Sequence, residues 1–330
     1  MATAQSDRDQ LIDRLFSAKS ALIISHIMPD ADTLGAALGL GLSLRSLGIV
    51  VRFACEDPAP TELRFLPSSS EIRPEPYAGE EVIVTVDISD QLRIGKLYDE
   101  KVFSSVPVLV IDHHVTNTRF GTLNWISDVP ATSEMILELL QARDVAISLE
   151  AATCLLAGII GDTQCFLTSN TTPSSLMAAA QLQKLGAPLR EIATTVLNRR
   201  PASALAVWRE AFINSYQEPG IIITTLGSAF LRGAGADDSS TNGLSSWLAG
   251  LDGILISAVL READDGSVDV SMRSVPEINI SVVSQKLGGG GHPQAAGCVL
   301  TGPLPAARER LLTELRPLVK PAAHGEETVH

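Results

Sequence analysis

Residues 21–35 read ALIISHIMPDADTLG and bring one imidazole and two carboxylates, those of His26, Asp30 and Asp32, into a single turn. The turn follows a short run of apolar residues, which is typical of a strand buried on both faces of a sheet. Small and apolar residues continue after it and predict a helix that ends near Gly48. A turn needs only one such polar group, so three of them indicate that something positively charged is held there.

Apolar runs with the same strand character recur as VVRFAC, EVIVTV and VPVLVI. Helical or loop segments separate them, and this alternation predicts a mostly parallel α/β sheet with helices on both faces. Among the helical patterns that follow is SEMILELLQA, which Thr132 or Ser133 is placed to cap. Beyond about Ala211, the runs GIIITTL, GILISAVLRE and SVDVSMRS predict a second sheet, and INISVVSQKLG predicts a helix.

The chain of 330 residues is long enough for two domains. The patterns predict an α/β domain over residues 1–186, a helical connector over residues 187–210 and a smaller α+β domain over residues 211–320. Residues 321–330 are predicted to form a solvated tail.

Composition argues against several classes of protein. The formal net charge of −13 disfavours a long basic track for duplex DNA or RNA, but it is compatible with a small phosphorylated substrate. No apolar run is long enough to cross a bilayer and the amino terminus lacks a secretion signal, so we expect a cytoplasmic protein without membrane contact. The four cysteines lack CxxC spacing and are interpreted as reduced thiols.

Polar residues that can bind metals follow several of the apolar segments. Asp87 follows EVIVTV, residues 112–114 (DHH) follow VPVLVI, and Asp162 ends another apolar segment. Ligands gather at the carboxyl ends of parallel strands, so these groups are expected to meet. Each residue alone also fits an ordinary structural role. Asp32 could cap the following helix, and a lone buried histidine is usually hydrogen-bonded within the core.

The distribution of the histidines favours a metal site over these ordinary roles. Two of the six histidines, His324 and His330, lie in the tail, and the other four fall in the polar clusters: His26, His113, His114 and His292. Carboxylates crowded at one sheet edge repel one another and are costly to desolvate, and two divalent cations remove that cost. Carboxylates and imidazoles without thiolates suit Mn²⁺ best, with Mg²⁺ or Co²⁺ as alternatives.

The order of these motifs resembles that of a known superfamily. HIMPDADTLG, VDISD, DHHVTN and GDTQCF resemble the four motifs of the DHH phosphoesterase superfamily, and SMRS followed by GGGGHPQAAG resembles its DHH-associated C-terminal domain. The layout is most similar to the nanoRNase and 3′-phosphoadenosine-5′-phosphate phosphatase group, which includes enzymes that act on cyclic di-AMP. One departure is that Ala36 follows Gly35 where the family commonly has serine; this removes a hydroxyl but no ligand.

The resemblance implies two metal ions and assigns their ligands. His26 and Asp30 would bind the first ion, and Asp87 would bridge both. The remaining ligands, those of the second ion, would be Asp32, His113 and Asp162.

By the same resemblance, three residues have catalytic roles in hydrolysis by two-metal activation of water. Asp87 would act through the two ions that it is expected to bridge. His114 would face the substrate phosphate, and Asp112 would orient the histidines.

The glycine run GGGGHPQAAG has two interpretations. Glycine lets backbone N–H groups approach an anion closely, although glycine runs are also common as flexible linkers. The resemblance favours substrate binding by residues 289–291 (Gly289, Gly290 and Gly291), by His292 and by Arg273 as a bidentate phosphate clamp. The alternative for Arg273 is an ordinary arginine on the surface of a strand.

The function expected from these motifs is hydrolysis of short oligonucleotides, 3′-phosphoadenosine 5′-phosphate or cyclic di-AMP to mononucleotides. The expected partners are such small substrates, without long duplex nucleic acid, and by analogy a homodimer. One alternative is a family II-type pyrophosphatase or polyphosphatase, against which the glycine–histidine loop counts. The other is a non-catalytic nucleotide or RNA sensor, which would be expected to lack at least one ligand.

Overall fold

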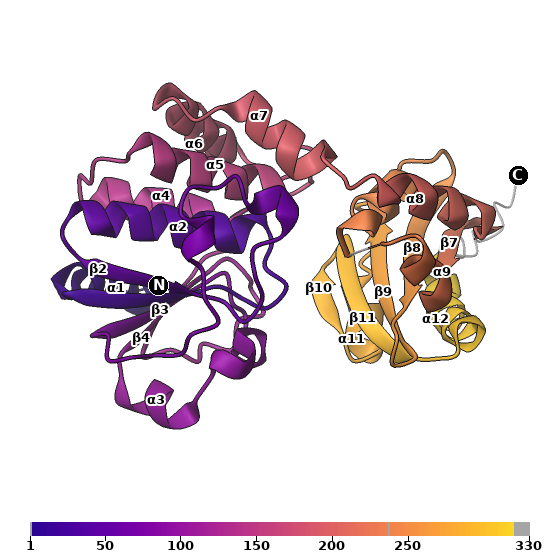
Figure 1. The fold of residues 1–330 in the computed structure, drawn as a ribbon, viewed down its shortest axis with the longest axis horizontal. Coiled ribbons are helices and arrows are strands. Elements are labelled where there is room, and N and C mark those ends of the chain that lie inside the picture. The colour runs from indigo at the N-terminus through magenta and orange to yellow at the C-terminus, as the bar shows by residue number, and fades with distance from the viewer. Residues whose placement is uncertain (1, 237, 320–330) are drawn as a thin grey trace, which may run out of the picture. The chain divides into compact units, whose positions relative to one another are not determined.

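A five-stranded parallel sheet organises the first half of the chain. The computed structural model describes residues 2–236 and 238–319, and the chain forms two compact units that divide between Arg199 and Arg200. In the first unit the strand order is β2-β1-β3-β4-β5, and every neighbouring pair is parallel (Figure 1). The strands are β1 (Ser20–Ile24), β2 (Val50–Ala54), β3 (Val82–Val86), β4 (Val108–Asp112) and β5 (Leu123–Ile126). The predicted parallel α/β sheet is therefore confirmed.

Both faces of this sheet are buried, each under its own cluster of apolar side chains. Successive side chains of a strand point to opposite faces, so each strand contributes to both clusters. In β1, Ile23 packs into the larger core and Leu22 into a second cluster on the opposite face. The second cluster takes side chains from η3 (Gln91–Leu97) and α3 (Glu100–Ser105). The helices whose residues enter the larger core are α1 (Ala2–Ser17), α2 (Ala31–Ser46), α4 (Thr132–Ala142), α5 (Leu149–Asp162), α6 (Pro173–Lys184) and α7 (Leu189–Ala193).

Helices α2 and α5 approach each other closely because glycine lies at their contact. A Cβ added at Gly35 would lie 2.5 Å from the carbonyl oxygen of Cys154 and 2.9 Å from the backbone nitrogen of Gly158. Both neighbours are backbone atoms, so a side chain could fit only if the helices moved apart. The contact lies within a turn of Asp32, near the start of α2, and of Asp162, the last residue of α5. Glycine packing therefore sets the separation of two predicted metal ligands.

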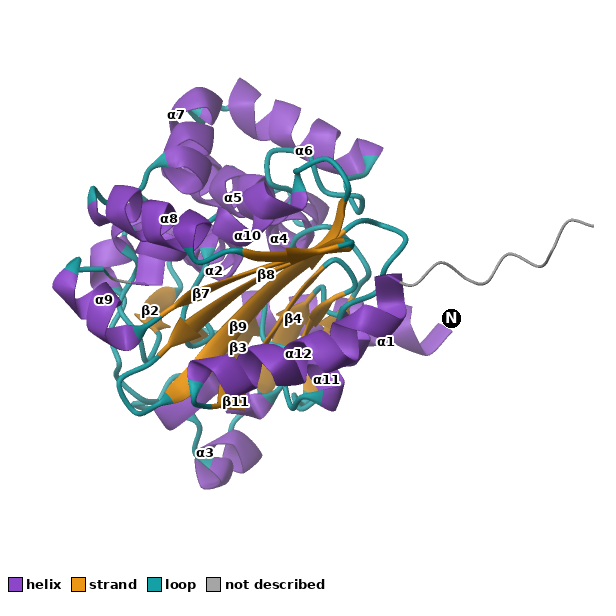
Figure 2. Cartoon of the chain, turned by 90° about the vertical axis from the view of Figure 1, so that its right-hand side faces the viewer, coloured by secondary structure: helices purple, strands orange, loops and turns teal. Residues whose placement is uncertain are grey.

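The second unit is built on a mixed sheet with the order β10-β11-β9-β8-β7-β6, in which only β7 and β8 are parallel. Side chains of α11 and α12 pack on one face of this sheet and those of α8, α9 and α10 on the other (Figure 2). The strands are β6 (Tyr216–Glu218), β7 (Gly220–Leu226), β8 (Ile254–Glu262), β9 (Ser267–Ser274), β10 (Gly290–His292) and β11 (Ala295–Thr301). The helices are α8 (Ser203–Ile213), α9 (Ser228–Gly233), α10 (Leu244–Ala249), α11 (Ser281–Lys286) and α12 (Leu304–Val319). The smaller α+β fold agrees with the prediction.

Some predicted boundaries differ from the structure. The helix expected over residues 278–288 is the shorter α11, and a π-helical turn, η4 (Thr194–Asn198), extends α7. The division between the units falls inside the predicted connector, residues 187–210, whereas the predicted tail, residues 321–330, lies outside the described residues. Across the described ranges, no helix combines the length and the apolar character that a bilayer crossing requires.

Gly35→Ala is expected to lower the free energy of unfolding. Inside a helix, alanine stabilises the fold by about 1 kcal/mol relative to glycine. Crowding of its Cβ against fixed backbone atoms lowers the free energy of unfolding by about 1–3 kcal/mol. We therefore expect a lower midpoint in thermal and urea denaturation. Gly233→Ala is the matched control, since a Cβ there has no heavy atom within 4 Å. Equal midpoints for the two variants would contradict the close approach of α2 and α5.

Candidate metal centre

The carboxyl ends of β1 and β3 are where this topology is expected to bind a ligand. Within the sheet, β2 lies beside one edge of β1, and β3 lies beside its other edge. The connections from β1 to β2 and from β2 to β3 therefore run in opposite directions across the sheet. Such a switch point leaves a crevice beyond the carboxyl ends of the two strands. His26 follows β1 by two residues, Asp87 directly follows β3, and Asp112 ends β4.

Donor atoms from widely separated segments gather at this edge, and two of the groups that they form contain the predicted ligands. The oxygen and nitrogen atoms of each group lie within 4.8 Å of one another. The first group consists of His26, Asp30 and Asp87. The second consists of Asp32, His113 and Asp162. The structure thus brings together all six residues that the resemblance implies as ligands.

Asp87 lies between the two groups. Its Oδ2 atom is 3.5 Å from Nε2 of His26, and its Oδ1 atom is 3.3 Å from Nε2 of His113. The carboxylate is 3% exposed, and the residue has a φ of +60°, which turns the chain as it leaves β3. Each oxygen of one buried carboxylate therefore faces a different imidazole.

Backbone carbonyls fix the orientation of the two imidazoles. Nδ1 of His26 donates to the carbonyl of Ile27 at 2.8 Å, and Nδ1 of His113 donates to that of Val129 at 2.9 Å. Because a carbonyl can only accept, each Nδ1 carries the hydrogen and each Nε2 faces the carboxylates. This is the arrangement that a metal-binding histidine needs.

The two aspartates of the first turn cap two different helices. Oδ1 of Asp30 accepts the N–H groups of Asp32 and Thr33 at 3.0 and 3.1 Å, so Asp30 is the N-cap of α2. Its other oxygen, Oδ2, lies 3.6 Å from Nε2 of His26. The alternative role of Asp32 as the cap of α2 is therefore wrong.

Asp32 instead binds the start of α4, which lies 100 residues further along the chain. Its carboxylate accepts the N–H groups of Thr132 at 2.6 Å and Ser133 at 3.0 Å. The prediction that Thr132 or Ser133 caps α4 is wrong, because the N-cap position is Ala131, which makes no side-chain hydrogen bond. A carboxylate near the positive end of a helix is favoured by the helix dipole.

Two residues of the site were not predicted as site residues. The hydroxyl of Thr132 donates to Oδ1 of Asp87 at 3.2 Å. Asn117 donates to Oδ2 of Asp112 at 2.6 Å, while Oδ1 of Asp112 lies 2.8 Å from Nδ1 of His114. Asn117 ends the motif DHHVTN, so its position in the motif was the signal that could have identified it.

Backbone strain is concentrated in the loops that carry the donors. Eight described residues other than glycine have positive φ, and six of them lie in these loops, namely Met28, Asp87, Arg119, Gln164, Cys165 and Phe166. Such conformations persist only where the surroundings impose them, and they are typical of functional sites. The donors are therefore held in place by the fold and not by local preference.

The charges of the cluster shift one another's pKa values. Burial opposes a charged imidazole, but Asp30 and Asp87 raise the pKa of His26 to about 10. Asp87 and Asp162 likewise overcome burial and raise the pKa of His113 to about 11. Burial and the negative charge of Asp87 raise the pKa of Asp32 to about 7. Protons thus compensate the carboxylates here, and divalent cations fit the same oxygen and nitrogen donors.

The predicted substrate residues of the second unit lie on one face of its sheet. His292 pairs with Ala295 and Ala295 pairs with Arg273, so the three form one row across β10, β11 and β9. Directly paired residues project to the same side of a sheet. Nη1 of Arg273 donates to the carbonyl of Met272, whereas its buried Nε has no hydrogen-bond partner among the described residues.

The glycine run is part of this sheet, and its interpretation as a flexible linker is wrong. Residues 290–292 form β10, which pairs with β11. A Cβ at Gly289 would lie 2.1 Å from the carbonyl oxygen of Gly297, and one at Gly291 would lie 2.5 Å from that of Ala295. At Gly290, by contrast, an added Cβ has no heavy atom within 4 Å. Two of the three predicted glycines are therefore required by strand packing.

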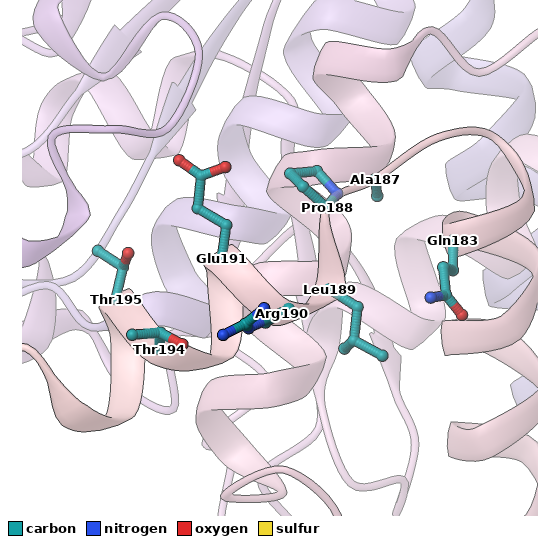
Figure 3. Close-up of a pocket in the computed structure, with 8 residues that line it drawn as sticks. All are labelled: Gln183, Ala187, Pro188, Leu189, Arg190, Glu191, Thr194 and Thr195. Carbon is teal, nitrogen blue, oxygen red and sulfur yellow. The ribbon is translucent and has the colours of Figure 1, made fainter.

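A hollow of about 560 Å³ on the first unit lies apart from these donors. Figure 3 shows its lining, which comes from the end of α6, from the loop that follows it, from α7 and from η4. Arg190 and Glu191 are its charged residues, and none of the predicted site residues line it. The concentration of donors, and not this hollow, identifies the candidate centre.

Comparison with known proteins gives relatives that match along most of the chain. The bifunctional oligoribonuclease and PAP phosphatase NrnA of Thermus thermophilus is 34% identical over 89% of this chain and 88% of its own. NrnA of Bacillus subtilis is 30% identical over 95% and 99%. The cyclic-di-AMP phosphodiesterase GdpP of Geobacillus thermodenitrificans is 28% identical over 92% of this chain but 48% of its own.

The fold and the domains match as well. An exopolyphosphatase-related protein from Bacteroides fragilis has the same fold, with a TM-score of 0.85 at 23% identity over 96% of this chain and 98% of its own. Residues 20–159 match the DHH family, N-terminal domain, and residues 219–320 match the DHHA1 domain. With donors grouped at the sheet edge where the DHH motifs fall, the chain belongs to the DHH phosphoesterase family, whose relatives here are named as hydrolases of phosphoester bonds.

Proposed function

We propose that this phosphoesterase hydrolyses short oligonucleotides and 3′-phosphoadenosine 5′-phosphate with two divalent metal ions. The two relatives named oligoribonuclease and PAP phosphatase match over 88% and 99% of their own lengths. The relative named cyclic-di-AMP phosphodiesterase matches over 48% of its length, so cyclic di-AMP is the second substrate class. We include a cytoplasmic location in the proposal, because the relatives are named for oligoribonucleotide, PAP and cyclic-di-AMP substrates.

The single observation that carries this proposal is the position of Asp87. Its oxygens lie 3.5 Å from Nε2 of His26 and 3.3 Å from Nε2 of His113. We assign Asp87 as the bridging ligand, with His26 and Asp30 for the first ion. We assign three further ligands to the second ion, namely Asp32, His113 and Asp162. Donors of this kind without thiolates favour Mn²⁺, with Mg²⁺ or Co²⁺ as alternatives.

The ions, when bound, lower the pKa of water and stabilise the negative charge of the phosphoryl oxygens. The chain itself orients the groups around them. Asp112 is fully buried and lies 2.8 Å from Nδ1 of His114, so it orients the imidazole that we assign to contact a substrate phosphate. Asn117 holds Asp112 in turn at 2.6 Å.

We assign binding of the rest of the substrate to the row of residues that holds Arg273 and His292 on the second sheet. Arg273 offers a guanidinium with an unsatisfied buried Nε, and His292 lies in the same cross-strand row. A guanidinium binds a phosphate through two parallel hydrogen bonds. Gly290, where no heavy atom lies near an added Cβ, leaves backbone atoms accessible beside them.

Asp87→Asn tests the bridging role. The amide keeps the shape but loses the charge shared by the two donor groups, so we expect Mn²⁺ content below two per chain and kcat lowered by at least about 100-fold. Turnover is measured with a diribonucleotide, 3′-phosphoadenosine 5′-phosphate and cyclic di-AMP, with pyrophosphate and a long oligonucleotide as comparison substrates.

Asp90→Asn is the matched control for Asp87→Asn, because Asp90 caps η3 and belongs to neither donor group. It should keep both ions and full turnover. Wild-type rates in Asp87→Asn would refute the bridging role. Preferred cleavage of pyrophosphate by the unaltered chain would replace the substrate assignment with a pyrophosphatase.

Mn²⁺ affinity should rise with pH. The pKa values of about 10 for His26 and about 11 for His113 mean that both imidazoles are protonated at neutral pH without metal. A metal must displace these protons, so acid weakens binding and base strengthens it, about tenfold per pH unit for each proton released. Isothermal titration calorimetry at pH 6, 7 and 8, in buffers of different ionisation enthalpy, measures the Mn²⁺ affinity and the number of protons released on binding. Affinity independent of pH would contradict the imidazole ligands.

Arg273→Gln should raise KM for nucleotide substrates about 10–100-fold, because a hydrogen bond to a charged group contributes about 1.5–3 kcal/mol. Mn²⁺ content should not change, since Arg273 belongs to neither donor group. Arg308→Gln removes an equivalent charge from α12 and serves as the control. An unaltered KM would return Arg273 to the role of a surface arginine.

A further inference from the structure

The loop that carries His26 and Asp30 is held from outside by the carboxylate of Asp57. Oδ2 of Asp57 accepts the N–H of Met28 at 2.7 Å. Asp57 lies in the loop after β2 and is not one of the six donors. Met28 is the middle residue of the five from His26 to Asp30, so this hydrogen bond acts on the turn that joins two proposed ligands of the first ion.

The conformation of Met28 needs such a restraint. Its φ is +50°, a region that residues with a side chain rarely adopt. Pro29 follows it, and a proline biases the preceding residue toward extended conformations. The side chain of Met28 is 70% exposed, so packing of the side chain does not explain the strained backbone.

The residues before Met28 have restraints of their own. The N–H of Ile27 donates to the carbonyl of Arg93 at 2.9 Å, and the thiol of Cys55 donates to the carbonyl of His26 at 3.2 Å. Asp30 is fixed by capping α2. Between these fixed points, the bond from Met28 to Asp57 is the side-chain contact at the apex of the turn.

We propose that Asp57 is a positioning residue for the first metal ion. By holding Met28 in its strained conformation, Asp57 keeps Oδ2 of Asp30 within 3.6 Å of Nε2 of His26. This inference rests on the proposed function, because it assigns both of those groups to a metal. It predicts that loss of Asp57 weakens one of the two ions selectively, since Asp57 bonds to the turn that joins His26 and Asp30, both assigned to the first ion.

The test measures the affinity of the full chain for Mn²⁺. Binding is monitored by calorimetry and by the electron paramagnetic resonance signal of free Mn²⁺. Asp57→Ala should weaken one of two ions about 10–100-fold, as loss of a group that orients a metal ligand generally does. Asp57→Asn keeps an acceptor oxygen and should stay within about threefold of wild type. Asp99→Ala is the matched control, because Asp99 also accepts a backbone N–H, that of Lys101 at 2.8 Å, but in α3.

A second variant isolates the backbone effect. Glycine adopts a φ of +50° without steric cost, so Met28→Gly should shrink the penalty of Asp57→Ala. An undiminished penalty in the double variant, or an equal loss in Asp57→Asn, would show that Asp57 acts through its charge and would overturn the inference. Two unaltered Mn²⁺ affinities in Asp57→Ala would overturn it as well. Failure of the unaltered chain to bind Mn²⁺ would instead refute the proposed function.

Discussion

Repulsion among carboxylates at one edge of the first sheet is the constraint on which this unit depends. Asp32, Asp87 and Asp112 are at most 3% exposed there, and burial in a medium of low dielectric constant intensifies their interaction. The fold compensates them with two oriented imidazoles, with the N–H groups at the start of α4, and with hydroxyl and amide donors. The compensating groups come from three separate segments, namely the loops after β1 and β4 and the start of α4, so the compensation requires these segments to be assembled together.

Rigid packing behind the edge offsets the strain within it. The donor loops contain six of the eight described non-glycine residues with positive φ, whereas the strands and helices that carry the loops are regular. Gly35 brings α2 against α5 and so brings the helix that starts beside Asp32 to the helix that ends with Asp162. Irregular loops on a closely packed scaffold allow side chains to be aimed with a precision that flexible loops do not achieve.

The strands and the donors could be predicted from sequence because each strand is a short apolar run that ends in a polar group. Parallel strands end at the same edge, so Asp87 and Asp112 had to lie near each other. The hydrogen bond from the N–H of Thr132 to Asp32 could not be predicted, because the two residues lie 100 positions apart. Rules for helix capping consider only residues that are close in sequence. Helices of six residues, such as α3 and α9, are too short to show a helical period. The strand β10 could not be predicted from the sequence, because two of its three residues are glycine, which is rare in strands.

Thr132 contacts both halves of the donor cluster, Asp32 through its N–H and Asp87 through its hydroxyl. Helix α4 therefore contacts the donor cluster directly, and it packs against α5 in the larger core. Leu139 and Leu140 are fully buried in that core about two turns from Thr132, so a change of side-chain volume there strains the helix that contacts both groups. Buried positions with no contact to a substrate thus become tuning points for the chemistry at the far end of the helix.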